Sequence, residues 1–324
     1  MHMWNKEMKF RNYTCLVLGG AGFIGSHLVD FLVSQKSQIY VVDNLSRGKA
    51  QNLQHCIDKI NFIEYDLRKD FPKFGTDIDY VFDFAATIWG ITNLYTQPAT
   101  LLSNNVRIAS NVLESVKNWN LVKYVYISSS CRYNFNGAKF PHKEEDLGYV
   151  KESYDWSKIF GEELCRAYGK EFKLPYSIVV PFNVYGGRES LDYPHVIPDF
   201  IKQAKEVKEK GLKEFKILGS GEQTRCFTYI DDCIEGIIDV ATKGRNREAY
   251  NIGSNIEVKV IDLAKMILKE FKLESIKIKS LPKIEGDIQR RIPSIEKAKI
   301  YLNWKPKTSL EDGLKKTIQW YMGV

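Results

Sequence analysis

Short apolar runs alternate with longer helical patterns along the first half of this sequence, and that alternation limits the fold more narrowly than any other feature. The apolar runs lie at 14–20, 38–44, 60–67, 80–86 and 123–130, with helical patterns at 23–36 and around 98–118. Apolar strands separated by helices indicate a parallel sheet that is covered on both faces. Right-handed crossovers then predict an α/β fold, a doubly wound parallel sheet of the Rossmann type.

The pattern becomes irregular after the run at 177–187, where shorter elements follow. Helices are expected at 198–210, 231–243, 260–271 and 311–322. We therefore expect a Rossmann nucleotide-binding domain over 1–182, completed by return strands near 226–253. A smaller C-terminal α/β substrate domain would take 183–225 and 254–324.

Composition excludes several classes of protein. With 324 residues, 44% hydrophobic and 27% charged, the chain is neither disordered nor fibrous. The 47 basic and 40 acidic residues leave a net charge of +7 without a long basic run, so no nucleic-acid partner is expected. No stretch approaches the roughly 20 apolar residues of a membrane span, and no secretory signal is evident, so no membrane partner is expected. Six cysteines without a CxxC pair predict a reducing, cytoplasmic location and no metal site.

Three glycines between the first strand and the first helix indicate a dinucleotide site. Gly19, Gly22 and Gly25 are spaced GxxGxxG, and such a turn lets a diphosphate approach the backbone and the N-terminus of the helix. Asp43 ends the second strand, 18 residues after Gly25, where a carboxylate can accept hydrogen bonds from ribose hydroxyls. It would repel a 2′-phosphate, which favours NAD over NADP, although Arg47 could hold such a phosphate.

Further cofactor contacts are expected near this turn and after the next two strands. Asp66, at the end of the third strand, is placed to contact adenine, or alternatively caps the turn before Leu67. The other expected contacts are Phe23, Ile24, Asn44, Ala85 and Ala86.

Tyr154 and Lys158 form a YxxxK pair, whose side chains share one face of a helix at this spacing. An ammonium beside a phenol favours the phenolate, which could act as general base on a sugar hydroxyl. By itself the pair is common on solvated helices. Here it follows a strand that ends in three serines (128–130), one of which could complete a triad.

Together these motifs resemble the extended short-chain dehydrogenase/reductase family, in particular its nucleotide-sugar epimerases, reductases and dehydratases. The resemblance extends from Tyr13 to the C-terminal helix, with landmarks at 19–25, 43–48, 84–86, 128–133, 154–158, 181–186 and 221–232. It implies NAD as cofactor, a nucleotide-diphosphate sugar as substrate, and a homodimer. It also implies Ser129 as the catalytic hydroxyl, four residues before Tyr133, with Ser130 as the alternative.

Within this family the sequence is most similar to the GDP-mannose 3,5-epimerase and GDP-L-fucose synthase groups. That resemblance implies Cys131 as an acid/base residue and His195 as its partner, because a C4 ketone acidifies the protons on carbons 3 and 5. Without the resemblance, a cysteine after a strand is more often core filler, and a lone histidine is more often structural. The positions that match substrate contacts are Ser130, Asn183, His195, Val196, Arg225 and Arg291.

Several departures leave the reaction open. The Asp-Glu pair of the 4,6-dehydratases is replaced by Ser130 and Cys131, which disfavours dehydration. Arg132 and Asn134 replace the usual neighbours of Tyr133, so the loop could accept a different sugar. The favoured function is a GDP-sugar epimerase that works by C4 oxidation. A C4 dehydrogenase, a 4-keto-sugar epimerase-reductase, a UDP-sugar 4-epimerase and a non-catalytic nucleotide-binding protein are the alternatives.

Overall fold

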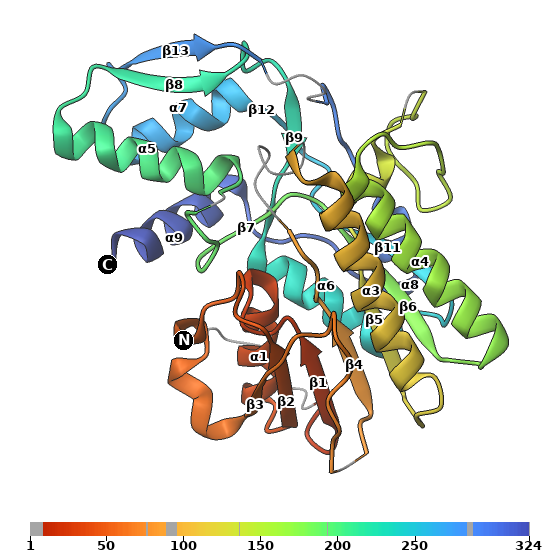
Figure 1. The fold of residues 1–324 in the computed structure, drawn as a ribbon. Helices are drawn as coiled ribbons and strands as arrows, with labels where there is room; N and C mark the ends of the chain where they lie inside the picture. Colours follow the sequence, from red (N-terminus) through yellow and green to blue (C-terminus); the bar gives the residue numbers. More distant parts are fainter. Residues whose placement is uncertain are drawn as a thin grey trace.

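The computed structural model describes residues 9–75, 77–88, 96–135, 137–192, 194–283 and 288–323. Within these ranges, seven parallel strands form one sheet in the order β11-β6-β5-β4-β1-β2-β3 (Figure 1). They are β1 (Thr14–Leu18), β2 (Gln38–Asp43), β3 (Asn61–Glu64), β4 (Tyr80–Asp83), β5 (Lys123–Ile127), β6 (Tyr176–Pro181) and β11 (Glu248–Ile252). The order reverses between β1 and β4, as a doubly wound sheet requires. The predicted fold class is confirmed.

Helices cover both faces of this sheet. On one face α1 (Phe23–Ser34) packs against α6 (Ile230–Lys243); on the other, α3 (Pro98–Val116) and α4 (Ser153–Glu171) lie side by side (Figure 1). Side chains of a strand point alternately to the two faces. Accordingly, Cys15 and Val17 of β1 join the core under α1 and α6, whereas Leu16 and Leu18 join the core under α3 and α4. All four of these β1 side chains are fully buried.

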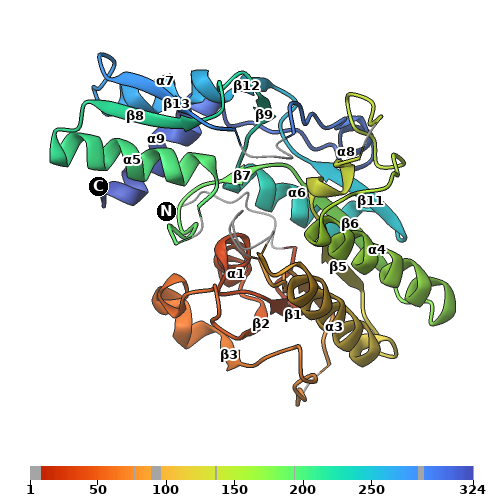
Figure 2. The same cartoon turned by 45° about the horizontal axis from the view of Figure 1, so that its top comes forward.

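The smaller part of the molecule lies at one end of the sheet. Its strands pair as β7 (Val184–Tyr185) with β10 (Thr228–Tyr229), β8 (Glu214–Leu218) with β13 (Lys277–Leu281), and β9 (Thr224–Cys226) with β12 (Glu257–Lys259). Its helices are α5 (Val196–Lys210), α7 (Val260–Glu270) and α9 (Leu310–Met322), whereas α8 (Glu296–Leu302) packs against α6 and β11 of the large sheet. Figures 1 and 2 show α5, α7, β8 and β13 at the top, opposite β2 and β3.

Three features differ from the sequence-based expectation. β3 ends at Glu64, so Asp66 lies in the turn beyond it. The run at 177–187 is divided into β6 and β7, because Asn183 has a φ of 38°, which extended backbone excludes. α8 has no counterpart among the predicted helices. Of the strands expected to return near 226–253, β11 joins the large sheet beside β6, whereas β9 and β10 pair outside it. The division of the chain into two domains stays a prediction.

Three short 3₁₀ helices complete the described secondary structure: η1 (Ala50–Asn52), η2 (Gln54–Lys59) and η3 (Ser130–Tyr133). None of the helices in the described ranges combines the length and the apolar character that a bilayer crossing needs.

Candidate active site

The glycine turn after β1 is built for close backbone approach. Gly19 has a φ of +72°, and a Cβ on Gly25 would lie 2.4 Å from the carbonyl oxygen of Gly19. Gly22 is the N-cap of α1 and offers no capping side chain. The first turn of α1, which contains Phe23 and Ile24, therefore presents its backbone N–H groups without a side-chain cap. Such a helix start suits a diphosphate group.

Asp43 lies directly beside this turn. Its Oδ2 accepts a hydrogen bond from Ala21 N–H (2.9 Å), and its Oδ1 accepts one from Leu45 N–H (2.8 Å). Burial raises the pKa of Asp43, and the two N–H donors oppose that rise. Since a carboxylate oxygen accepts more than one hydrogen bond, Asp43 can also accept from two ribose hydroxyls. The residues present thus fit NAD.

Arg47, the residue that could have favoured NADP, donates a hydrogen bond to the carbonyl oxygen of Ile88 (3.0 Å). The contact joins the loop after β2 to the loop after β4, which contains Ala85 and Ala86. In that second loop, Thr87 N–H donates to Asn105 Oδ1 (2.6 Å). Asn105 in turn donates to the Ser157 hydroxyl on α4 (3.0 Å). Hydrogen bonds therefore connect the two expected cofactor loops to the helix of Tyr154.

Asp66 is held by its own neighbour. Arg68 donates to both carboxylate oxygens through Nε and Nη2, at 2.6 to 3.1 Å, and this ion pair lowers the pKa of Asp66. Its Oδ1 also accepts from Arg68 N–H (3.0 Å), so Asp66 caps the turn after β3. Leu67 is buried, and Asn44 accepts hydrogen bonds from Ser46. Contacts of these residues with adenosine stay a prediction.

The catalytic residues predicted from the three-serine segment and the YxxxK motif come together. Ser129 caps η3, and its Oγ accepts from Cys131 N–H at 3.3 Å. A hydrogen bond with Ser129 lowers the pKa of the Tyr154 phenol, but burial raises it more strongly. Cys131 and Asp155, as acidic neighbours, raise it further. The structure therefore brings Ser129, Cys131 and Tyr154 into one group whose phenol is protonated.

The expected effect of Lys158 on Tyr154 is wrong for this structure. Lys158 Nζ donates to the carbonyl oxygen of Ile127 at the end of β5 (2.9 Å) and lies 5.4 Å from the centre of the Tyr126 ring. Burial lowers the pKa of Lys158, and the largest influences on the Tyr154 pKa do not include it. Helical spacing puts both residues on one face, but a long lysine side chain reaches the acceptor that the sheet offers.

Cys131 is protonated rather than a thiolate. Burial raises the pKa of its thiol, and the carboxylate of Asp155, to which the thiol is hydrogen-bonded, raises it further. Asp155 is only 3% exposed, and burial raises its pKa from 3.8 to about 6. Asn134 Nδ2 donates to Asp155 Oδ2 at 2.9 Å. The sequence did not single out Asp155, because acidic residues are common in the first turn of a helix and do not by themselves indicate a functional site.

His195 is the N-cap of α5, on the side of the smaller domain. Its Nδ1 is paired with Glu189 Oε1, and its backbone N–H donates to the same oxygen (3.3 Å). The charge of Glu189 raises the pKa of His195, whereas Arg47 and Arg291 act against that rise. The side chain of His195 is 73% exposed. His195 therefore lies within electrostatic reach of Arg47, in the loop after β2, and of Arg291, in the segment before α8. Glu189 lies in an irregular loop, and no sequence signal identified it.

The expected substrate contacts divide into two groups. Arg291 donates to Asn134 Oδ1 (2.6 Å) and to the hydroxyl of buried Ser130 (3.5 Å), which places it beside Cys131. Arg225 donates to Thr224 O within β9 (2.8 Å), and Asn183 donates to Cys226 O (2.9 Å). Val196 begins α5 beside His195. Substrate binding by these residues stays a prediction.

Arg132 is buried, contrary to the suggestion that it alters sugar choice. It is 1% exposed, and its Nη1 pairs with Glu162 Oε2 of α4 at 2.7 Å. Glu162 also accepts from the Ser128 hydroxyl (2.5 Å) and from Arg166 (3.1 Å). The ion pair of Arg132 with Glu162 thus links η3 to α4.

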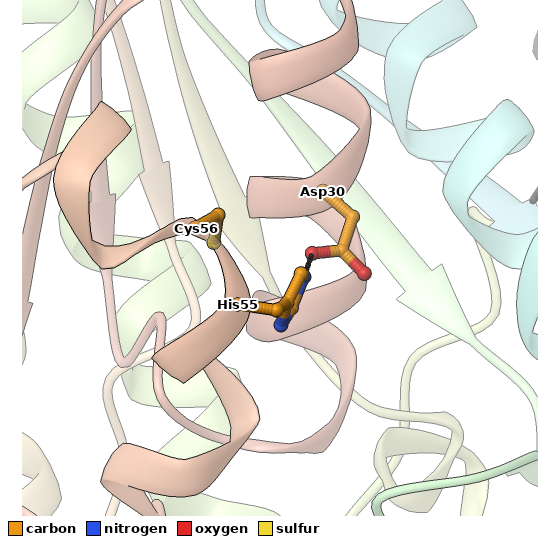
Figure 3. A group of neighbouring side chains, drawn as sticks. All are labelled: Asp30, His55 and Cys56. Carbon is orange, nitrogen blue, oxygen red and sulfur yellow. Dashed lines mark hydrogen bonds and ion pairs between the residues drawn. The ribbon is translucent and has the colours of Figure 1, made fainter.

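One group among the described residues could present three metal ligands: Asp30 of α1 with His55 and Cys56 of η2 (Figure 3). The Asp30 oxygens already have partners, since Oδ1 binds His55 Nε2 (2.7 Å) and Oδ2 binds Arg188 (2.6 Å). Cys56 donates to Leu53 O, and burial raises its pKa to about 11. These contacts indicate a hydrogen-bonded ion-pair network between α1, η2 and Arg188.

Known proteins are similar to this chain over nearly its whole length. Residues 15–253 match the model of the NAD dependent epimerase/dehydratase family. A UDP-N-acetyl-alpha-D-glucosaminuronate decarboxylase of Bacillus cytotoxicus is 32% identical over 96% of this chain and 98% of its own. A GDP-L-fucose synthase of Sinorhizobium fredii is 31% identical over 94% of this chain and 93% of its own. The structure of UDP-glucuronic acid 4-epimerase from Bacillus cereus, in complex with UDP-glucuronic acid and NAD, superposes with a TM-score of 0.84 at 30% identity, covering 96% and 99% of the two chains.

Proposed function

The chain belongs to the NAD dependent epimerase/dehydratase family of nucleotide-sugar enzymes, and from that premise we propose that it epimerises a GDP-sugar through transient oxidation at carbon 4. NAD is its cofactor. The observation that carries the proposal is the group formed by Ser129, Tyr154 and Cys131, with Asp155 behind the thiol. A reaction limited to carbon 4 would not need the thiol or its carboxylate.

Tyr154 is the residue that exchanges a proton with the C4 hydroxyl. Ser129 lies at hydrogen-bonding distance from the phenol and can hold the same hydroxyl in place. Bound NAD supplies the hydride acceptor at carbon 4 and a positive ring whose charge favours the Tyr154 phenolate. Lys158 fixes the end of β5 by donating a hydrogen bond to the carbonyl oxygen of Ile127.

Cys131 and His195 are proposed to move the proton on carbon 3 or 5 once carbon 4 is a ketone. Asp155, with a pKa of about 6, is ionised at neutral pH and can take the Cys131 proton. The resulting thiolate accepts the sugar C–H proton, and the electron pair of that bond moves into the enolate. Because Glu189 raises the pKa of His195, the ring can carry a proton and donate it to the other face of the sugar ring.

The test uses enzyme as purified, supplied with GDP-mannose in D₂O and no added NAD. We expect isomeric products that carry deuterium at carbon 3 or 5, with no net change in absorbance at 340 nm. Build-up of NADH would instead identify a C4 dehydrogenase. Exchange that persists in both Cys131→Ala and His195→Ala would refute the proton-transfer roles, and inversion confined to carbon 4 would identify a 4-epimerase.

Decarboxylation is a second candidate, favoured by the 32% identical relative that is named a decarboxylase. A sugar with a carboxylate on carbon 5 becomes a β-keto acid when carbon 4 is oxidised. Such an acid loses CO₂ and needs only one proton donor to complete the product. UDP-glucuronic acid under the same conditions distinguishes the two reactions, because release of CO₂ would favour decarboxylation.

We also propose a homodimer, with α3 and α4 as the interface. These helices lie side by side on an outer face of the sheet (Figure 1), and Phe160 of α4 is 46% exposed. Sedimentation equilibrium of the protein and of Phe160→Glu tests this arrangement. A monomeric parent, or a variant that dimerises equally well, would contradict it.

A further inference from the structure

Glu189 is a buried carboxylate in the loop between β7 and α5. Its side chain is 3% exposed, and a carboxylate so far removed from water needs a cationic partner. Oε1 contacts both Nδ1 and the backbone N–H of His195, whereas the buried Oε2 has no hydrogen-bond partner among the described residues. The negative charge of Glu189 is therefore directed at one imidazole ring.

Contacts with α1 and α9 hold this loop in place. The Tyr321 hydroxyl of α9 donates to the carbonyl oxygen of Glu189 (2.7 Å). His27 of α1 is hydrogen-bonded to the carbonyl oxygen of Gly187 (3.1 Å), and a Cβ on Gly187 would lie 2.6 Å from the Trp320 ring. Helices α1 and α9 thus hold the segment that carries Glu189, so the carboxylate has little freedom to leave His195.

The other surroundings of His195 disfavour a positive ring. Arg47 from the loop after β2 and Arg291 from the segment before α8 both lower its pKa. The ring also sits at the N-terminus of α5, where the helix dipole repels a cation. Asp199 lies in the first turn of α5, and Asp192 is exposed and contacts Ser190 and Lys49. Among the charged residues that the structure describes, Glu189 is the one hydrogen-bonded to the ring, and its charge outweighs the opposing ones.

We propose that Glu189 is a positioning residue that keeps His195 protonated and directs its Nε2 toward the substrate. The proposal rests on the proposed role of His195 as proton donor. With Nδ1 held by Glu189, Nε2 is the ring nitrogen left to meet a substrate from the solvent side. When the Nε2–H bond breaks, the proton forms a C–H bond with the electron pair of the enolate. The ring becomes neutral and keeps Nδ1–H on Glu189, so the same tautomer forms in every turnover.

The test compares Glu189→Gln with Asp192→Asn, which removes the same charge from the same loop without touching the ring. NMR titration of the five histidines, with His195 assigned from His195→Asn, gives the pKa directly. We expect a His195 pKa above 6.5 in the parent and in Asp192→Asn. In Glu189→Gln it should fall below 6.5, because Arg47, Arg291 and the helix dipole are then unopposed. Deuterium entry into the sugar at pH 8 should fall about tenfold in Glu189→Gln for each unit by which the His195 pKa falls, because the protonated fraction of the ring falls in that proportion.

The two readouts separate this inference from the proposed function. A parent enzyme that turns over no nucleotide sugar contradicts the proposed function. The titration needs no substrate, so a lowered His195 pKa in Glu189→Gln would still support the role of Glu189 in setting that pKa. An unchanged His195 pKa in Glu189→Gln, or an equal fall in Asp192→Asn, overturns the inference. Undiminished deuterium entry in Glu189→Gln overturns it as well, provided that His195→Asn abolishes exchange.

Discussion

Replacing Asp155 by asparagine should stabilise the protein at neutral pH. Asparagine has nearly the same shape, and its Oδ can still accept from Asn134, which is 2.9 Å away. The folded protein raises the Asp155 pKa from 3.8 to about 6. At 1.36 kcal/mol per pKa unit this corresponds to about 3 kcal/mol of stability lost when the buried carboxyl ionises.

The sign of the pH dependence follows from that rise. Between about pH 4 and 6 the folded state binds the Asp155 proton and the unfolded state has released it. Stability contributed by this group is therefore complete below pH 4 and falls as pH rises through 6. The asparagine variant lacks this fall. Its free energy of unfolding should exceed that of the parent by up to about 3 kcal/mol at pH 8, with the gap closing toward pH 4.

Urea unfolding at several pH values measures this gap. Asp192→Asn is the control, because Asp192 is an exposed carboxylate whose Ser190 and Lys49 contacts lower its pKa, so no gain is expected. A variant Asp155→Asn that is less stable than the parent at pH 8 would refute the reasoning. A gap that does not change with pH would refute it equally, because the stabilisation would then not come from ionisation.

Other predictions concern the glycine turn after β1, the buried ion pair of Arg132 with Glu162, and Tyr154 as the proposed general base. Gly25→Ala should abolish NAD binding, measured by calorimetry, because the new Cβ would lie 2.4 Å from a backbone oxygen; Gly75→Ala, with open space around it, should bind normally. Arg132→Met should lower the free energy of unfolding in urea by about 3–5 kcal/mol, because Glu162 is then buried and poorly compensated. The double variant Arg132→Met, Glu162→Met should recover most of this loss. A loss below 1 kcal/mol would show that the pair is not buried. Tyr154→Phe should abolish turnover and spare NAD binding; unchanged turnover would remove the proposed base.

The sequence predicted what depends on local spacing. Gly19 and Gly25 could be recognised because a tight turn between a strand and a helix excludes a Cβ, and Asp43 because the end of β2 lies beside that turn in a parallel sheet. The group of Ser129, Cys131 and Tyr154 could be predicted because the loop after β5 and the start of α4 meet at the same sheet edge.

What could not be predicted depends on contacts between segments. Lys158 has the expected place on α4, but its ammonium binds Ile127 of a different element. Arg132 follows two candidate site residues and yet points into the core, because Glu162 of α4 offers a buried carboxylate there. Glu189 becomes important only through the fold of an irregular loop against α9 and α1, for which no periodic pattern exists.

The strand order has a consequence for synthesis on the ribosome. Inner strand β6 has β5 on one side, but its other neighbour is β11, whose residues 248–252 emerge about 70 residues later. Until then the nascent sheet presents an unpaired backbone edge, of the kind to which another chain can add a strand. A fragment that stops at 182 would keep that edge permanently, and we expect it to aggregate unless a peptide spanning 248–252 is supplied to pair with β6.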